Sequence, residues 1–492
     1  MIQWFNPQFR YNLLAMLRLV FAAILFASFS LSACNAPISP SYQIEKKEIE
    51  VRFLSSPAQT LHLRATYHLK NIGNAPLDFL DAELPSSLGR QNLRIELDGQ
   101  PVSPTLTAET TRIAFPSSWP VKSSCSLLIE YDLAPPDQFT KDAFYLLPNN
   151  WYPALLPPKQ LLAKADPPDK WDLRIRVPDG FLVHASGKLR GSSRSGTDRV
   201  FRFTQRPNDD FRPFLVSGRF VEHRFNGSGI PVIFWAPQSA SSDALRMIAT
   251  GVGASVTYFE SVFGPRHRSS SPVWIVQHTF PGNGHTGRLI QPPLPEVAVI
   301  PDGVSFPGNS LEETLMITNL PLADTWLRHL STPQGDLAYL LAFNLSVWVS
   351  FSAAESAGES GKQARMRADL WNYYEEARSQ YPEISLKEYV STVGKQWINK
   401  IARNEDAEGL RNIFAAKSGL FIFALEDTVG PKNFRAALRR MIQARRDLDW
   451  SIDDLRSALE LESGQNLAEF FRVWLYQPGI PDDFRRRHSQ AP

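Results

Sequence analysis

The sequence has little cysteine, no excess of either charge and no apolar run of 20 residues. Two cysteines among 492 residues cannot build a disulfide scaffold. The 52 Lys and Arg residues balance 50 Asp and Glu residues, which excludes a strongly basic nucleic-acid-binding chain. Because 43% of the residues are apolar, the chain is too hydrophobic for an intrinsically disordered protein. A folded protein of more than one domain remains, since single cores stop growing near about 250–300 residues.

The N-terminus has the pattern of an export signal. Arg10 and Arg18 precede an uncharged apolar run over residues 19–31, which is too short to cross a bilayer as a helix. The run ends in Leu-Ser-Ala-Cys at residues 31–34, which resembles the lipobox of bacterial lipoproteins, whose cysteine is acylated after cleavage. Residues 1–33 are therefore expected to be a lipoprotein signal peptide, with lipid attached to Cys34. The alternative is an ordinary cleaved signal with an incidental cysteine.

This interpretation predicts a lipid-anchored protein of the cell envelope. By resemblance to the sorting of Gram-negative lipoproteins, Asn35 after the acylated cysteine favours the outer membrane, if the source has one. If Cys34 carries lipid, Cys125 has no partner for an intramolecular disulfide. Cys125 alternates with Leu127 and Ile129, so we expect a buried strand residue.

A second apolar stretch, residues 337–354, lacks charge for eighteen positions. That length is just at the lower limit for a transmembrane helix. Asn344 and three serines dilute the stretch, and no basic cluster flanks it closely. A buried core helix is the preferred interpretation, and a membrane span is the alternative.

The periodicity of the sequence divides the chain into a β-rich and a helix-rich part. Leu61, Leu63, Ala65, Tyr67 and Leu69 alternate with polar residues, which predicts a strand with one dry face. Similar short strands separated by turns, including the hairpin signal at residues 98–99, predict an antiparallel β-sandwich over residues 34–229. Residues 214–220 and 230–235 are expected to form its last strand pair.

After residue 230 the apolar spacing becomes helical. A first helix is expected to end at Gly264, and capping signals begin at Ser385 and Ser451. The order, sheet first and helices afterwards, predicts an α+β protein with a mostly helical second domain over residues 230–481. Residues 482–492 are expected to be a frayed charged tail.

Several segments of the mature chain, in the same order, resemble the membrane alanyl aminopeptidase family, zinc metallopeptidases of the gluzincin group. The resemblance extends over residues 42–481. It rests on residues 42–53, Trp151-Tyr152-Pro153, Val216-x-Gly218-x-Phe220, Phe263-Gly264, Lys417, Gly430, Phe434, Ala437-Leu438, Gly464 and the segment 470–481. It implies a sandwich followed by a thermolysin-like helical domain, and an ancestral zinc aminopeptidase activity.

Members of this family hold zinc with H-E-x-x-H on one helix and a Glu that follows the second His after eighteen intervening residues. Such a site needs three protein ligands and leaves one position open for an activated water. The matching register in this chain places Leu320 and Asp324 at the two histidines, Pro321 at the first glutamate and Phe343 at the second. Leucine and phenylalanine have no lone pair for a metal, so zinc binding is not expected. Pro321 also opposes the preceding helical turn, so a break or a new helix start is expected near Leu320.

Two further positions of the family pattern have changed. The glutamate that holds the substrate's free amine corresponds to Gly284, within the glycine-rich segment 282–287. The tyrosine that stabilises the oxyanion corresponds to Ala415, two residues before Lys417. Ligands, general base, amine anchor and oxyanion donor are thus all replaced, which predicts the loss of peptidase chemistry.

Other chemical sites have weaker signals. His278, His285 and His329 are candidates for a relocated metal site with Asp324, although three ordinary loop or surface histidines are the preferred interpretation. Glu312-Glu313 fits a solvated first helical turn better than a catalytic pair. No G-x-S-x-G elbow occurs.

Three functional hypotheses follow. The first is an inactive, zinc-free aminopeptidase-like envelope lipoprotein that binds or scaffolds a peptide or protein, is anchored to the membrane by its N-terminal lipid and does not bind nucleic acid. The second is an active peptidase or hydrolase with a non-standard metal site. The third is a purely structural envelope component.

Overall fold

The computed structural model describes residues 42–54, 60–84, 90–106, 110–133, 142–146, 151–156, 171–205, 214–265, 272–278, 297–301, 318–320, 322–324, 326–327, 330–356, 361–381, 383–390, 406–446 and 448–488. These residues fall into two compact units, one within residues 42–221 and the other within residues 222–277 and 297–488. Strands dominate the first unit and helices the second, so the protein is an α+β mixture, as predicted. The boundary falls between Val221 and Glu222.

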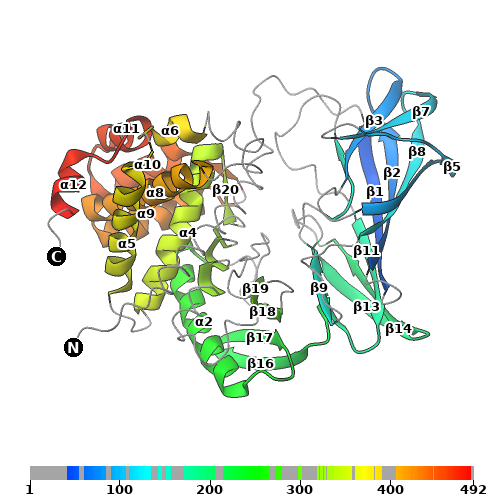
Figure 1. The fold of residues 1–492 in the computed structure, drawn as a ribbon, viewed down its shortest axis with the longest axis horizontal. Helices are drawn as coiled ribbons and strands as arrows, with labels where there is room; N and C mark the ends of the chain where they lie inside the picture. The colour runs from blue at the N-terminus through cyan, green and yellow to red at the C-terminus, as the bar shows by residue number, and fades with distance from the viewer. Residues whose placement is uncertain are drawn as a thin grey trace. The chain divides into compact units, whose positions relative to one another are not determined.

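The first unit is built on an eight-stranded sheet with the strand order β13-β14-β11-β1-β2-β8-β4-β5 (Figure 1). Its strands are β1 (Tyr42–Leu54), β2 (Thr60–Asn71), β4 (Arg90–Leu97), β5 (Gln100–Pro101), β8 (Ser124–Leu133), β11 (Trp171–Pro178), β13 (Lys188–Ser195) and β14 (Asp198–Thr204). The alternation predicted for β2 is present, because its five apolar residues from Leu61 to Leu69 are fully buried. Cys125 on β8 is buried as predicted, and burial raises the pKa of its thiol to about 12.

A second layer makes this unit a sandwich. It is a four-stranded sheet with the order β10-β3-β7-β6. Its strands are β3 (Leu77–Glu83), β6 (Thr105–Leu106), β7 (Thr111–Trp119) and β10 (Ala154–Leu156). Leu80 of β3 and Ile113 of β7 belong to the same buried core as Leu63 and Ile175 of the large sheet. A smaller sheet of β12 (Leu182–Ala185), β15 (Leu215–Gly218) and β9 (Ala143–Leu146) completes the unit.

Among its described strands, the sandwich is antiparallel with one exception, which corrects the prediction. β1 pairs with β2 in antiparallel register but with β11 in parallel register, with Glu50 opposite Arg174. A short connection forces neighbouring strands to run in opposite directions, whereas a long one does not. β11 joins β1 only after the chain has passed through the second layer, so no hairpin fixes its direction. The predicted hairpin at Asp98-Gly99 is confirmed, with positive φ at both residues and antiparallel pairing of β4 and β5.

The second unit begins with a sheet of its own. Its order is β16-β17-β18-β19, formed by β16 (Val221–Gly227), β17 (Ile230–Ala236), β18 (Val273–His278) and β19 (Val297–Pro301). The predicted pairing of residues 214–220 with residues 230–235 is therefore wrong. β15 pairs with β9 and β12, whereas β17 pairs with β18 in parallel register. The turn at positive-φ Ser228 and Gly229 joins β16 to β17 and forms the hairpin that sequence reasoning missed.

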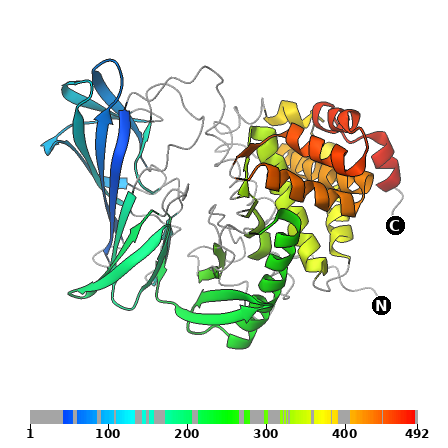
Figure 2. The ribbon, with the colours of Figure 1, turned by 180° about the vertical axis from the view of Figure 1, so that it is seen from behind.

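Helices form most of the second unit (Figure 2). They are α2 (Ser242–Phe263), α4 (Asp336–Ser356), α5 (Lys362–Arg378), α6 (Leu386–Glu388), α8 (Asp406–Val429), α9 (Pro431–Ala444), α10 (Ile452–Ser463), α11 (Ala468–Tyr476) and α12 (Asp482–His488), with a two-stranded sheet of β20 (Thr332–Pro333) and β21 (Asp449–Trp450). Their ends follow the predicted signals. Gly264 ends α2, Pro431 begins α9, and Ser451 and Asp454 form a capping box on α10.

The C-terminal segment differs from the frayed tail that we expected. Residues 482–488 form α12, and the side chain of Phe484 is almost fully buried against Trp474. Asp482 and Asp483 lie in the first turn of this helix, where the helix dipole favours acidic residues. Arg485 forms an ion pair with Glu383. The burial of one aromatic side chain thus packs this segment against the protein, although its charge pattern predicted a solvent-exposed tail.

Helix α4 carries the apolar stretch that had two interpretations. It is the one helix among the described residues that is long and apolar enough to cross a membrane, and 94% of its apolar window is buried within the protein. Its buried serines donate hydrogen bonds to carbonyls one turn earlier, as Ser346 does to Ala342 and Ser350 to Ser346. This burial supports the interpretation as a core helix.

Candidate functional site

The segment that matches the family's first metal motif is helical. Residues 318–320 and 322–324 are helical, and so are Trp326 and Leu327. The helix therefore does not begin at Leu320, and helical residues resume directly after Pro321, which itself lies outside the described residues. Proline removes one amide donor but keeps a φ that a helix accepts, so flanking residues can remain helical.

The positions that the sequence register matches to the family's zinc ligands and oxyanion tyrosine, as far as the structure describes them, are all buried. Their exposed fractions are 2% for Leu320, 4% for Asp324, 0% for Phe343 and 6% for Ala415. Leu320, Phe343 and Ala415 belong to one continuous cluster of buried hydrophobic side chains. A zinc site needs nitrogen, oxygen or sulfur donors around an open position. Hydrocarbon side chains occupy three of these four positions instead.

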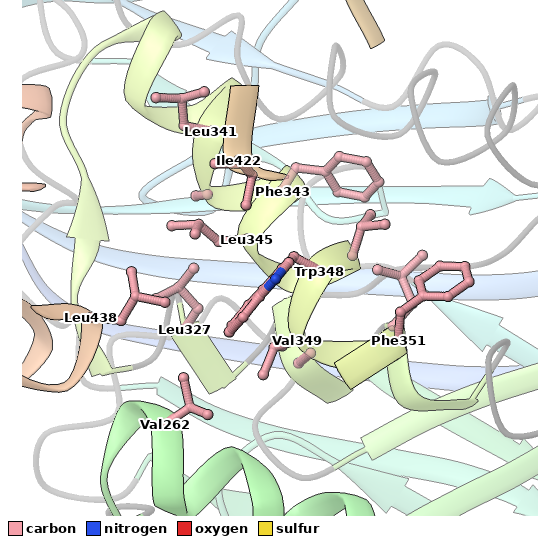
Figure 3. Close-up of a cluster of buried hydrophobic side chains, with 14 of the residues drawn as sticks. Val262, Leu327, Leu341, Phe343, Leu345, Trp348, Val349, Phe351, Ile422 and Leu438 are labelled. Carbon is pink, nitrogen blue, oxygen red and sulfur yellow. The ribbon is translucent and has the colours of Figure 1, made fainter. Parts of the chain in front are cut away.

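Helix α4 carries Phe343, which the sequence register matches to the family's distant glutamate. Figure 3 shows Phe343 within a cluster of apolar side chains from several helices, among them Ile422 of α8 and Leu438 of α9. A carboxylate in such surroundings would lose its hydration without gaining a partner. The aromatic ring instead contributes packing area to the core.

Asp324 is the one described motif position that still carries a donor atom. Among the described residues, no group of three His, Cys, Asp or Glu side chains is placed to hold a metal ion. Gly284, His285 and His329 lie outside the described residues, as does the side chain of His278, so the relocated site remains a hypothesis. One carboxylate alone supplies one ligand where a protein zinc site uses three or four.

Helix α8 carries Ala415, which the sequence register matches to the family's oxyanion tyrosine, and two residues later the buried Lys417. The side chain of Lys417 is fully buried, and its Nζ donates a hydrogen bond of 2.7 Å to the carbonyl of Gln477. Burial in this apolar environment lowers the pKa of Lys417 to about 8. The contact joins α8 to the end of α11, so Lys417 acts as a structural tie between the two helices.

Buried polar groups between α4 and α8 have partners that sequence reasoning did not identify. Trp348 donates its indole N–H to Glu426 at 2.8 Å, and burial raises the pKa of Glu426. Asn344 donates to Ser418 at 3.0 Å. The available signal was a lysine and a glutamate inside the apolar run of α8, since charges are rarely buried unless paired. These contacts fix the register of two core helices.

Comparison with known proteins identifies the fold. Neither a family model nor a curated protein matches the sequence. A solved M1 zinc metallopeptidase from Deinococcus radiodurans is 17% identical over 90% of this chain and 95% of its own, with a TM-score of 0.57. The chain has the fold of an M1 zinc metallopeptidase.

Two further M1 structures agree. A mutant of the Deinococcus radiodurans enzyme bound to a Tyr-Ser-Ala substrate is 16% identical over 90% of this chain and 95% of its own, with a TM-score of 0.56. A two-domain M1 mutant bound to L-arginine is 17% identical over the same shares, with a TM-score of 0.58. Likeness at this identity establishes the M1 fold, and the activity has to be argued from residues.

Proposed function

We propose that this chain is a catalytically inactive, aminopeptidase-like lipoprotein of the cell envelope that binds peptide or protein. The observation that carries the proposal is the burial of Leu320 and Phe343 in one apolar cluster, at the positions where the family places a ligand. A metal gains nothing from hydrocarbon, and an activated water needs both a metal and a base. Peptide hydrolysis by the family's mechanism is therefore lost.

Metal content and hydrolysis test the loss of activity. The purified mature chain is expected to hold less than a tenth of an equivalent of zinc by elemental analysis. It is also expected to leave aminoacyl p-nitroanilides intact, with or without added zinc. Asp324→Asn is the matched variant, because it removes the one motif oxygen with little change in shape. Under our proposal it alters neither measurement.

The alternative, an active hydrolase with a relocated metal, predicts the opposite. Stoichiometric zinc, chelator-sensitive hydrolysis, and loss of both in the Asp324→Asn variant would together overturn the proposal. A metal that Asp324→Asn leaves in place would show that a site exists elsewhere, and hydrolysis would then decide whether it is catalytic.

The ligand class is supported by the fold. Two of the M1 neighbours are bound to a Tyr-Ser-Ala substrate and to L-arginine. A protein that keeps this fold without its metal ligands loses turnover and retains a surface suited to peptide. Titration calorimetry with Tyr-Ser-Ala and longer peptides measures this directly. No binding by any peptide would favour the alternative of a purely structural envelope component.

The membrane anchor is part of the same proposal. Acylation of Cys34 would tether the mature chain to the envelope, with the outer membrane expected in a Gram-negative source. Cys34→Ala is expected to move the protein from the detergent-extracted membrane fraction to the soluble or unprocessed fraction. Mass spectrometry of the mature N-terminus would show the acyl chains in the wild type. An unmodified Cys34 would contradict the lipoprotein assignment while leaving the loss of hydrolysis untouched.

A further inference from the structure

The outward face of the sandwich's large sheet gathers arginine side chains that lie far apart in the sequence. In β1, β11 and β14 the residues Val51, Ile175 and Phe203 are buried in the sandwich core, so the alternate residues face outward. Cross-strand register places Arg52 opposite Arg176, and Arg174 opposite Arg202. Arg64 lies on β2, the other neighbour of β1, and it is in the same cross-strand row as Arg174, with Glu50 of β1 between them. We call these five outward residues, Arg52, Arg64, Arg174, Arg176 and Arg202, the arginine face.

Among the residues that the structure describes, no side chain of the arginine face forms an ion pair or a hydrogen bond. Four of the five side chains are exposed, and the Nε of Arg176 is buried without an acceptor. Carboxylates also lie beside these arginines. Glu50 is opposite both Arg174 and Arg64, Glu130 is opposite Arg64, and Glu48 interacts electrostatically with Arg174. None of them forms an ion pair with the arginine face, and within the face the pairs Arg52–Arg176 and Arg174–Arg202 are directly opposed.

The other half of the same sheet face is neutralised. His62 contacts Asp132 and Glu130, each at 2.8 Å, and Arg94 pairs with Glu96 and Glu130. Like charges directly opposite each other on adjacent strands destabilise a sheet, whereas opposite charges stabilise it. The repulsion in the arginine face is relieved when anions are bound there.

The chemistry of the face points to phosphate. Guanidinium groups bind phosphate oxygens in a bidentate geometry and are weakly hydrated, so they suit phosphate better than ammonium groups do. Neighbouring strands lie about 4.8 Å apart, with side chains roughly perpendicular to the sheet. The arginines therefore form a flat array rather than a pocket.

A membrane surface fits this array better than a protein partner does. Protein interfaces have an apolar or aromatic centre, and none of the exposed large hydrophobic side chains of the described residues lies on β1, β11 or β14. Position in the chain agrees, because β1 begins at Tyr42, eight residues after Cys34. Eight extended residues span at most about 29 Å, so an acylated Cys34 would hold β1 near the headgroups. This second argument rests on the proposed lipid anchor.

We propose that the arginine face is a docking surface for anionic phospholipid headgroups, which holds the sandwich flat against the membrane. A lipid anchor fixes only one point of the chain, whereas a basic patch adds electrostatic attraction to anionic lipids over its whole area. Each arginine near an anionic surface contributes a further increment to binding that salt screens. The lipid would thus tether the protein, and the arginine face would orient the sandwich on the membrane.

Vesicle flotation tests the proposal without the lipid anchor. The probe is the mature chain with Cys34→Ser, mixed with phosphatidylcholine vesicles that contain or lack 30% phosphatidylglycerol. Binding is expected only with phosphatidylglycerol, and 0.5 M salt is expected to abolish it. The variant R52Q/R174Q/R202Q is expected to bind about a hundredfold more weakly, from roughly one factor of five per arginine.

The matched control is R94Q/R112Q/R194Q, which removes the same charge from exposed arginines of the sandwich that are paired with carboxylates. It is expected to bind within about twofold of the starting protein. Equal losses in both variants, or equal binding to both kinds of vesicle, would overturn the proposal. Binding to polyglutamate with no binding to vesicles would also overturn it and assign the face to an acidic protein. Acylation and hydrolysis do not enter these measurements, so failure here is distinct from failure of the proposed function.

Discussion

The packing of α4 against α8 in the helical unit and the arginine face of the sandwich differ in how they hold polar groups. In the core, the indole N–H of Trp348 and the amide of Asn344 each have a partner, and hydrocarbon occupies Leu320 and Phe343. On the arginine face, Arg52 lies opposite Arg176 and Arg174 lies opposite Arg202, and none of these four side chains forms an ion pair among the described residues. A buried unpaired group costs far more than an exposed one, because water compensates the exposed group. The cost of burial therefore disfavours metal-ligating side chains in the core once no metal is bound. The exposed surface tolerates arginines that have no bound anion.

Restoring the ancestral carboxylate gives the largest expected effect. Phe343→Glu removes a fully buried ring and inserts a group that has no partner there. The lost packing alone costs about 3–5 kcal/mol, and burial of the carboxyl group adds to it. We expect a fall in the melting temperature of more than about 10 °C or no folded protein at all. Calorimetry or circular dichroism measures this.

Phe343→Leu is the matched control, since it keeps an apolar side chain in the same cluster. It is expected to cost about 1 kcal/mol. A Phe343→Glu protein with an unchanged melting temperature, or one that gained stoichiometric zinc, would show that the core around α4 still accommodates a ligand. The contrast between core and surface would then fail.

The pH dependence of the unfolding free energy tests the buried charge of Lys417. Its expected effect is smaller than that of Phe343→Glu. The folded pKa of Lys417, about 8, lies below the unfolded value of 10.5, so between these values the unfolded chain binds more protons than the folded one. Stability contributed by this group is therefore smallest below pH 8 and rises with pH toward 10.5. Urea unfolding is expected to show a gain of about 1 kcal/mol from pH 7.5 to 9 that Lys417→Met lacks.

Cys125 has to be separated from this effect. Burial raises its pKa to about 12, so its thiol lowers stability as the pH rises above 9, the opposite sign. That contribution is common to the wild type and to Lys417→Met, and the difference between the two proteins removes it. Parallel pH profiles for both would contradict the buried, charged state of Lys417 at neutral pH.

The contrast also explains what the sequence predicts and what it does not. The buried row of β2, the Asp98-Gly99 hairpin and the ends of α2 and α10 follow from local periodicity and capping, which residues close in the chain determine. The arginine face does not follow, because it depends on the parallel pairing of β1 with β11. α12 was missed because one buried side chain, Phe484, outweighs a charged surrounding sequence.

The candidate site also has one part that the local sequence predicts and another that only tertiary packing determines. The apolar pattern predicted a core helix over residues 337–354, and Phe343 within it is fully buried. The partners of Lys417 and Glu426 come from other helices, so only tertiary packing reveals them.

The smallest expected effect compares the two halves of the sheet face directly. Arg52 has Arg176 and His62 as its cross-strand neighbours, whereas Arg94 pairs with Glu96 and Glu130. Arg52→Gln is therefore expected to stabilise the protein by about 0.2–0.5 kcal/mol at low salt, and Arg94→Gln to destabilise it by a similar amount. Both changes are expected to shrink in 0.5 M salt, because screening acts on exposed charges of either arrangement. Urea unfolding of the two variants in parallel resolves the sign, and effects of the same sign would mean that repulsion within the arginine face is already relieved by water alone.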